Sequence, residues 1–123
     1  MYKNVLIATD GSVTASHAAE VGVDVAKASG ADVLILHVGD PGSGKKVLSQ
    51  AEKAHSKSGV TVKTLSVSGD PADMICEVAE REGADLIVIG NKGMTGAKRF
   101  LLGSVPNQVS HHAPCNVLIV KTT

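Results

Sequence analysis

One glycine-rich frame of this sequence has the residue types and spacing of a phosphate-binding loop. The frame reads G-x2-G-x9-G-S and consists of Gly90, Gly93, Gly103 and Ser104. It follows the apolar run Leu86–Ile89 and precedes a short polar segment, Val105–His112, that could form a helix. Glycine has no Cβ, so such a loop can bring backbone N–H groups close to a phosphate, and Ser104 would add a hydroxyl at the helix N-terminus. The frame predicts an anion site where a strand passes to a helix, although any single glycine could equally serve an ordinary turn.

Charged residues suggest further chemistry near this frame. The frame is locally basic because it contains Lys92, Lys98 and Arg99. Arg99 is the best candidate for a bidentate phosphate contact, and the alternatives are a solvated loop and a contact between subunits. Asp10, which follows the apolar run Val5–Ala8, could act as a general base or ligate a divalent ion. No acid, base or nucleophile is paired with it in a recognisable frame, and Ser104 is not in a G-x-S-x-G elbow, so we predict no catalytic residue.

A second glycine-rich stretch, Gly39–Lys45, matches the P-loop pattern G-x4-G-K. Position 46 is Lys, whereas that pattern needs Ser or Thr there to ligate magnesium, so we do not interpret the stretch as a true P-loop. A weaker hypothesis is that Lys45 or Lys46 reaches the phosphates as a point charge. No two histidines have a spacing that indicates a metal site.

Composition excludes several classes of function. The 123 residues suffice for one domain, residues 1–123, and the 12 acidic and 12 basic side chains cancel. Tyr2 and Phe100 are the only aromatic residues, so the stacking platforms of nucleic acid binders are missing and we expect no nucleic acid partner. No apolar run is long enough to span a membrane, and neither Cys76 nor Cys115 belongs to a CxxC pair. We expect a cytoplasmic protein with no membrane contact and no zinc.

The apolar pattern predicts strands that alternate with helices. The expected strands are Val5–Ala8, Val33–Val38, a half-exposed segment from Val60 to Val67, Leu86–Ile89 and Val117–Val120. Asp70-Pro71 predicts a helix start, whereas Gly39–Gly44 is interpreted as a loop. Continuous apolar strands separated by helices predict an α/β fold with a parallel, doubly wound sheet. Ligands bind outside the carboxyl ends of the strands in such sheets, which here places Asp10, Val38 and Gly90 at the site.

Several segments together resemble a known family over essentially the whole chain. They are the opening VLIATDGS, the turn from Gly69 to Ile75, the strand ADLIVIG, the frame GNKGMTGAKRFLLGSV and the ending NVLIVK. The chain resembles a universal stress protein of the nucleotide-binding type. The resemblance implies a Rossmann-like five-stranded sheet of order 3-2-1-4-5 and a homodimer that pairs the last strands, Val117–Val120.

The same resemblance implies roles for individual residues. Asp10 would bind the adenosine part, with Ala8 and Thr9 beside it, and Val38 and Ile89 would line the adenine slot. Backbone N–H groups and one hydroxyl would hold the ribose and phosphates, from Gly90, Gly93, Gly103, Ser104 and Val105. The position of His37 at the end of the second predicted strand, near the presumed adenine slot, allows a role in the site, but we favour a hydrogen-bonded core or rim residue. The segment after Val38 is shorter than is usual in this family, which would leave the nucleotide less covered.

The leading functional hypothesis is a sensor that binds ATP and acts on an unidentified regulatory protein in a stress response, with Mg²⁺ or Mn²⁺ as the accompanying ion. AMP and cyclic AMP are alternative ligands, and the local basic charge favours a triphosphate. A slow ATPase that uses Asp10 with a divalent ion is a second reading, against which the missing catalytic base argues. A dimer with an empty site is a third reading, against which the intact glycine frame argues.

Overall fold

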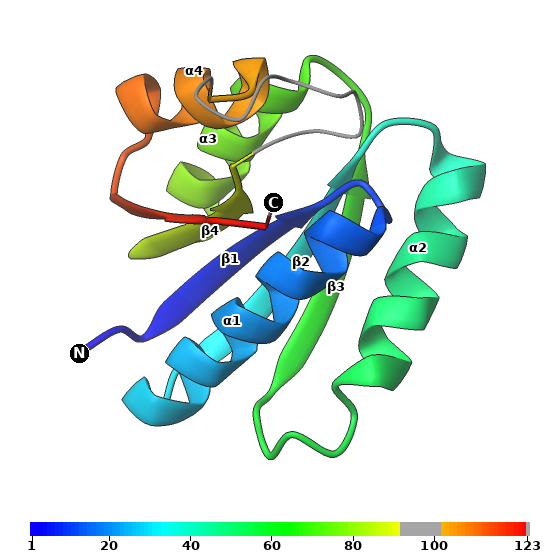
Figure 1. Cartoon of the computed structure of the whole chain (residues 1–123), viewed down its shortest axis with the longest axis vertical. Coiled ribbons are helices and arrows are strands. Elements are labelled where there is room, and N and C mark those ends of the chain that lie inside the picture. The colour runs from blue at the N-terminus through cyan, green and yellow to red at the C-terminus, as the bar shows by residue number, and fades with distance from the viewer. Residues whose placement is uncertain (92–101, 123) are drawn as a thin grey trace.

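The computed structural model describes residues 1–91 and 102–122, in which strands and helices alternate along the chain (Figure 1). The strands are β1 (Asn4–Thr9), β2 (Asp32–Val38), β3 (Val62–Val67), β4 (Leu86–Gly90) and β5 (Asn116–Val120). The helices are α1 (Val13–Ser29), α2 (Pro41–Ala54), α3 (Pro71–Arg81) and α4 (Ser104–His112). Each predicted strand is present, with its ends within two residues of the predicted ones.

All five strands form one parallel sheet in the order β3-β2-β1-β4-β5. The central strand β1 pairs with β2 from Asn4↔Asp32 to Thr9↔His37 and with β4 from Val5↔Leu86 to Ile7↔Val88. The predicted α/β architecture and strand order are therefore confirmed. The half-exposed strand β3 lies at one edge of the sheet, as its interrupted apolar pattern predicted, and β5 lies at the other edge.

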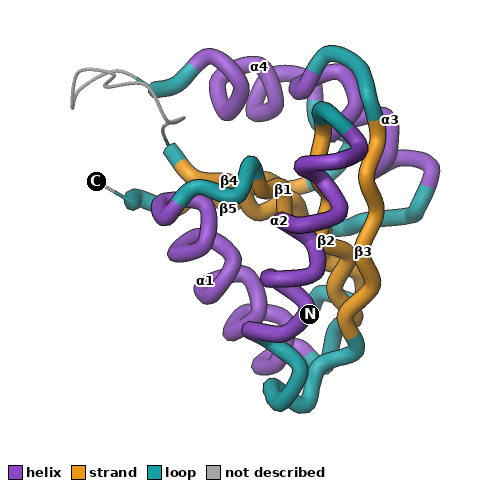
Figure 2. The backbone as a smooth tube through the Cα atoms, turned by 90° about the vertical axis from the view of Figure 1, so that its right-hand side faces the viewer, coloured by secondary structure: helices purple, strands orange, loops and turns teal. Residues whose placement is uncertain are grey.

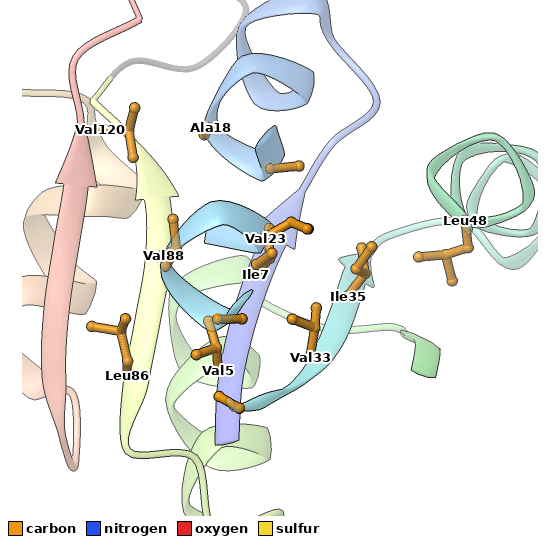
Figure 3. Packing of buried hydrophobic residues seen from close by; sticks show 13 residues of the cluster. Val5, Ile7, Ala18, Val23, Val33, Ile35, Leu48, Leu86, Val88 and Val120 are labelled. Carbon is orange, nitrogen blue, oxygen red and sulfur yellow. The ribbon is translucent and has the colours of Figure 1, made fainter. Parts of the chain in front are cut away.

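Helices cover both faces of the sheet, with α1 and α2 on one side and α3 and α4 on the other (Figures 1 and 2). Successive side chains of a strand point to opposite faces, so β1 sends Val5 and Ile7 towards α1 while Leu6 and Ala8 join the core beneath α3 and α4. Figure 3 shows the first of these two cores, in which Val23 of α1 lies over Ile7. Because both faces are buried, β1, β2 and β4 carry continuous apolar runs rather than an alternating pattern.

Close approach of α1 to the sheet depends on one glycine. A Cβ on Gly22 would lie 2.7 Å from Cδ1 of Ile7 and 3.3 Å from Cγ1 of Val88. These two contacts belong to β1 and β4, the pair of strands at the centre of the sheet. Glycine at this position therefore lets the α1 backbone lie directly over the two strands whose carboxyl ends form the candidate site.

The segment Gly39–Gly44, interpreted from the sequence as a loop, is mostly helix. Helix α2 begins at Pro41, and the Asp40 side chain caps it by accepting a hydrogen bond from the Ser43 N–H at 3.1 Å. Asp70 and Pro71 begin α3 in the same way. An aspartate at the N-cap followed by proline at the first helical position outweighs the poor helix propensity of the glycines.

Candidate functional site

The carboxyl ends of β1 and β4 lie side by side at the centre of the sheet. From β1 the chain builds outward through β2 and β3, and it then returns to the other side of β1 to form β4 and β5. The strand order therefore reverses between β1 and β4, which is where open parallel sheets bind ligands. Asp10 follows β1 directly and Asn91 follows β4 directly.

An apolar patch lies at this end of the sheet on the α4 side. Ala8, Val38 and Ile89 come from the ends of β1, β2 and β4 and belong to the same core cluster, to which α4 contributes Val105 and Val109. Ala8 and Ile89 are buried, whereas Val38 and Val105 are half-buried. Three neighbouring strands thus present small or branched apolar side chains on one face, as a slot for a flat apolar ring requires.

The turn after β1 is held by its own side chains. The Gly11 N–H donates to Oγ1 of Thr9 at 3.1 Å, and the Ser12 N–H donates to Oδ1 of Asp10 at 2.9 Å. Ser12 in turn caps α1 by accepting from the Ala15 N–H. Asp10 is exposed, and its carboxylate can accept hydrogen bonds from a bound hydroxyl while this turn fixes its direction.

The N-terminus of α4 faces the end of β4. The Gly103 N–H donates to the backbone oxygen of Asn91 at 2.9 Å, so the chain that leaves the sheet after Asn91 returns to the same place. Gly103 is the N-cap of α4, and no described side chain caps this helix. Within the described part of the chain, the first backbone N–H groups of α4 therefore have no side-chain partner, which is what an anion site at a helix N-terminus requires. Pro106 has no N–H, so these donors are those of Ser104 and Val105.

Ser104 stands in the first turn of α4, exposed, with its hydroxyl accepting a hydrogen bond from Nε2 of Gln108 at 3.0 Å. A hydroxyl that accepts one bond can still donate its hydrogen to a phosphate oxygen. Gly90, Gly103 and Val105 lie at the same end of the sheet, because the bond between Gly103 and Asn91 joins the start of α4 to the end of β4. Gly93 and Arg99 lie outside the described residues.

His37 lies at the end of β2, as predicted, but on the other face of the sheet from the apolar patch. It is 6% exposed and points to the α2 side of the sheet, where its Nδ1 and Oγ of Ser66 are buried without a hydrogen-bond partner among the described residues. Val38, the next residue of the strand, points to the α4 side instead. His37 is therefore a core residue, as we expected, but its Nδ1 lacks the expected hydrogen bond among the described residues.

The two lysines proposed as phosphate contacts do not lie on the α4 face of the sheet. Lys45 and Lys46 are exposed on α2, which covers the opposite face of the sheet. Among the residues that the structure describes, there is no cluster of three or more His, Cys, Asp or Glu side chains that could hold a metal ion. No helix in residues 1–91 or 102–122 is long and apolar enough to cross a membrane.

A groove of about 600 Å³ runs between α1 and α2, also on the opposite face from α4. Small apolar side chains such as Ala19, Val23 and Ala51 line it, and Glu20 and Asp24 stand among its charged residues. Two helices that diverge over a twisted sheet leave such a groove between them. The groove reaches the carboxyl end of β1 at Thr9 and Gly11, but its lining includes neither the apolar patch nor any residue of α4, so we do not include it in the candidate site.

Asn91 is a site residue that the sequence analysis did not single out. Its backbone oxygen holds Gly103, and its backbone N–H donates to the oxygen of Val120 at 2.9 Å. Its side-chain oxygen accepts from both the N–H and the hydroxyl of Thr122. Its place inside the glycine frame was visible in the sequence, but the partner at position 122 was not.

Comparisons with known proteins agree with this architecture. The model of the universal stress protein family matches residues 1–53 and 42–121. The chain is 37% identical to universal stress protein MJ0531 of Methanocaldococcus jannaschii, over 98% of this chain and 83% of the relative. It is 32% identical to universal stress protein YxiE of Bacillus subtilis, over 98% of this chain and all of the relative. A crystal structure of a universal stress protein in complex with cAMP matches with a TM-score of 0.87 and 34% identity, over 99% of this chain and 98% of that one.

This chain lacks a segment that the relative MJ0531 contains. The alignment with MJ0531 runs over 141 positions, whereas this chain has 123 residues, so at least 18 aligned positions have no counterpart here. The two segments matched by the family model overlap at residues 42–53, within α2. This position agrees with the short connection after Val38 noted in the sequence. By the family model and by its relatives, the chain belongs to the universal stress protein family.

Proposed function

We propose that this protein binds one adenine nucleotide per subunit at the carboxyl ends of β1 and β4 and acts as a stress-response sensor. The observation that carries the proposal is the meeting of three features at one place. These are the apolar patch of Ala8, Val38 and Ile89, the exposed Asp10 carboxylate, and the N-terminus of α4, which no described side chain caps. An adenine ring, a ribose and a phosphate need these three environments, in this order.

Each residue then has a role set by its chemistry. The adenine ring lies against Val38 and Ile89, with Ala8 and Thr9 beside it, and Asp10 accepts hydrogen bonds from the ribose. Gly90 lets the backbone approach the ligand, and the phosphate binds the first N–H groups of α4 and the Ser104 hydroxyl. Gly93 and Arg99 belong to the same proposed site through the sequence pattern alone.

ATP is the ligand that the basic residues of the glycine frame favour, because a triphosphate carries more charge than a cyclic monophosphate. Cyclic AMP is the second candidate, since a relative that is 34% identical was crystallised with it. The α4 N-terminus offers the N–H groups of Ser104 and Val105, a number that suits one phosphate group. With ATP, an accompanying Mg²⁺ or Mn²⁺ would be held largely by the phosphates, because no cluster of three ligating side chains is found among the described residues.

We also propose a cytoplasmic homodimer that pairs the β5 edges and a function in binding rather than in efficient hydrolysis. The strand β5 ends the sheet, and its residues Val117, Leu118 and Ile119 are only half-buried. An apolar edge strand of this kind is stabilised when a second strand pairs with it. The Ser12 N–H holds the Asp10 carboxylate in one direction, in which its oxygens can accept the hydrogen bonds that a ribose donates.

Calorimetric titration of the nucleotide-stripped protein with ATP, AMP and cyclic AMP, each with and without magnesium, tests the ligand. Binding of one adenine nucleotide per subunit, without release of ADP over hours, is the expected result. Steady ADP release would replace the sensor with an ATPase. No binding of any of the three would refute the proposed site.

Two variants test the position of the site. Gly103 has φ −60° and ψ 156°, which any residue can adopt, so Gly103→Val adds a side chain without backbone strain. The valine would occupy the phosphate position, and we expect nucleotide binding to be lost from a folded protein. Ser104→Ala should weaken binding about 5- to 20-fold for one charge-assisted hydrogen bond. Ser110→Ala on the same helix is the matched control, because its hydroxyl donates to the Asn107 carbonyl oxygen instead.

A further inference from the structure

Asn91 uses three of its polar atoms to join segments that are far apart in the sequence. Its backbone N–H donates to Val120, and its backbone oxygen accepts from Gly103, both at 2.9 Å. Its side-chain Oδ1 accepts from the N–H of Thr122 at 2.8 Å and from the Thr122 hydroxyl at 2.9 Å. Asn91 is half-buried, and the residue that it bonds through its side chain is 31 positions away.

The side-chain hydrogen bonds of Asn91 are not part of the backbone ladder between β4 and β5. The paired register of β4 and β5 ends at Gly90↔Val120, and the Asn91 N–H extends the ladder by one bond. The two bonds from Thr122 lie past that point and hold the chain after β5. Residues near the end of a strand normally fray unless a side chain ties them down. Asn91 supplies that tie, and Figures 1 and 2 both show the chain after β5 ending close to the end of β4.

The same residue supports the N-terminus of α4. Gly103 is the N-cap of that helix, and its N–H is held by the backbone oxygen of Asn91. Gly103 also accepts the first backbone hydrogen bond of the helix, from Asn107 at 3.0 Å. A displacement of Asn91 therefore moves both the start of α4 and the chain at Thr122.

We propose that Asn91 is a positioning residue that couples nucleotide occupancy to the carboxyl end of β5. The proposal rests on the proposed nucleotide site, of which Gly90 and Gly103 are the backbone neighbours of Asn91. A ligand that holds the backbone at these glycines keeps the Asn91 oxygen on Gly103 and its Oδ1 on Thr122. Binding free energies are reciprocal, so fixing Thr122 must raise nucleotide affinity by the same factor.

Through this coupling, nucleotide binding would change the surface at the β5 edge of the sheet. Val120 ends the edge strand that we propose pairs with a second copy of the chain, and Thr122 lies two residues beyond it. A nucleotide that stabilises this end lengthens the ordered edge available to the partner strand. Occupancy would thereby be reported at the subunit interface without a large movement of the sheet.

Amide hydrogen exchange at Thr122, measured with and without saturating cyclic AMP or ATP, tests the coupling directly. In the wild type, we expect the nucleotide to slow exchange of this amide at least about 5-fold, the lower end of ordinary coupling between sites. In Asn91→Ala the Thr122 amide should exchange fast and show no response to the nucleotide. In Asn91→Asp the carboxylate still accepts both bonds from Thr122, so the response should return.

A double-mutant cycle on nucleotide affinity separates coupling from general damage. Thr122→Pro removes both donors to Oδ1 while leaving the core and the paired part of β5 intact. Asn91→Ala and Thr122→Pro should each weaken binding about 5- to 50-fold. The double variant should be no weaker than the weaker single variant, because both remove the same bonds. Thermal unfolding of each variant, with Ser110→Ala as the control, shows that the fold is retained.

Each outcome decides one question. If the wild type binds none of the nucleotides, the proposed function and the coupling both fail. If the wild type binds, but the two losses of affinity add or the Thr122 amide does not respond, the coupling alone is overturned. If Asn91→Ala unfolds, the double-mutant cycle cannot be completed. The Thr122→Pro variant then decides alone: if it binds the nucleotide with wild-type affinity, the coupling is overturned.

Discussion

Replacing Gly22 with alanine tests how closely α1 lies over the centre of the sheet. The new Cβ would stand 2.7 Å from Cδ1 and 2.8 Å from Cγ1 of Ile7. Carbon atoms pack best at about 3.5–4.0 Å, so the gap is roughly 1 Å too small. Ile7 is fully buried, so a rotation of its side chain away from the new Cβ would press on closely packed neighbours in the core.

The expected change in the free energy of unfolding is a difference of two effects. Alanine is favoured over glycine inside a helix by about 0.5–1 kcal/mol, whereas overpacking a core costs about 1–3 kcal/mol. We expect Gly22→Ala to be destabilising by about 1 kcal/mol or somewhat more, which lowers Tm by roughly 3–6 °C in a domain of this size. Urea unfolding followed by far-UV circular dichroism gives the same quantity from the midpoint.

A second substitution shows whether the contact with Ile7 is the cause. Ile7→Val removes Cδ1 and costs about 0.5–1.5 kcal/mol by itself. Combined with Gly22→Ala, it should cost less than the sum of the two single changes, because the closest atom is gone. An unfolding midpoint of Gly22→Ala equal to or above that of the wild type would refute the close approach of α1.

Three further predictions concern the rest of the fold. Burial would raise the pKa of Asp85, but hydrogen bonds from the N–H groups of Lys3 and Asn4, together with the Lys3 charge, outweigh it and hold that pKa below its usual value. A carboxylate with a lowered pKa in the folded state stabilises the protein at pH values above the ordinary aspartate pKa of about 3.9. The loss of stability in Asp85→Asn should therefore be greatest near pH 7 and should vanish as the pH falls through the folded-state pKa. A loss that stays constant across pH would contradict this. Asp40→Ala should cost about 1 kcal/mol in urea unfolding, because it removes the cap of α2, and no loss would mean that the first turn of α2 is not formed. Ser66→Ala removes a buried hydroxyl that has no hydrogen-bond partner among the described residues, so it should leave stability unchanged or raise it by up to about 1 kcal/mol. A clear loss of stability would reveal a hydrogen bond that this geometry lacks.

The strands could be predicted because the sheet is buried on both faces. Continuous apolar runs such as Leu86–Ile89 are what parallel strands require, and β4 follows its run to within one residue. The start of α2 was missed because the glycines were given more weight than the Asp40-Pro41 pair. The same pair at Asp70-Pro71 was interpreted correctly. Gly44 is kept in the helix for a reason that the sequence does not show, since a Cβ there would contact Oγ of Ser66 and Nδ1 of His37.

The candidate site was predictable where it depends on strand ends. Asp10, Val38 and Gly90 follow from the rule that parallel sheets bind ligands at their carboxyl ends. The opposite orientations of His37 and Val38 could have been predicted from the sequence, because neighbouring strand residues point to opposite faces. Asn91 could not have been found in this way. Its importance comes from Thr122, and only the pairing of β4 with β5 brings the two together.

The two ends of the sheet differ in how their backbone groups are satisfied. At the amino end, the Asp85 carboxylate accepts the N–H groups of Lys3 and Asn4, and the backbone oxygens of the same two residues accept from Asp32 and Asp85. That end is closed by the protein's own hydrogen bonds. At the carboxyl end, α4 begins at Gly103, which offers no side chain to its first N–H groups. A serine or aspartate there would stabilise the helix, but it would also satisfy the donors that an anion needs. Glycine at this position therefore favours a ligand over the stability of the helix, and the Asn91 bond compensates by holding Gly103 in place without using those donors.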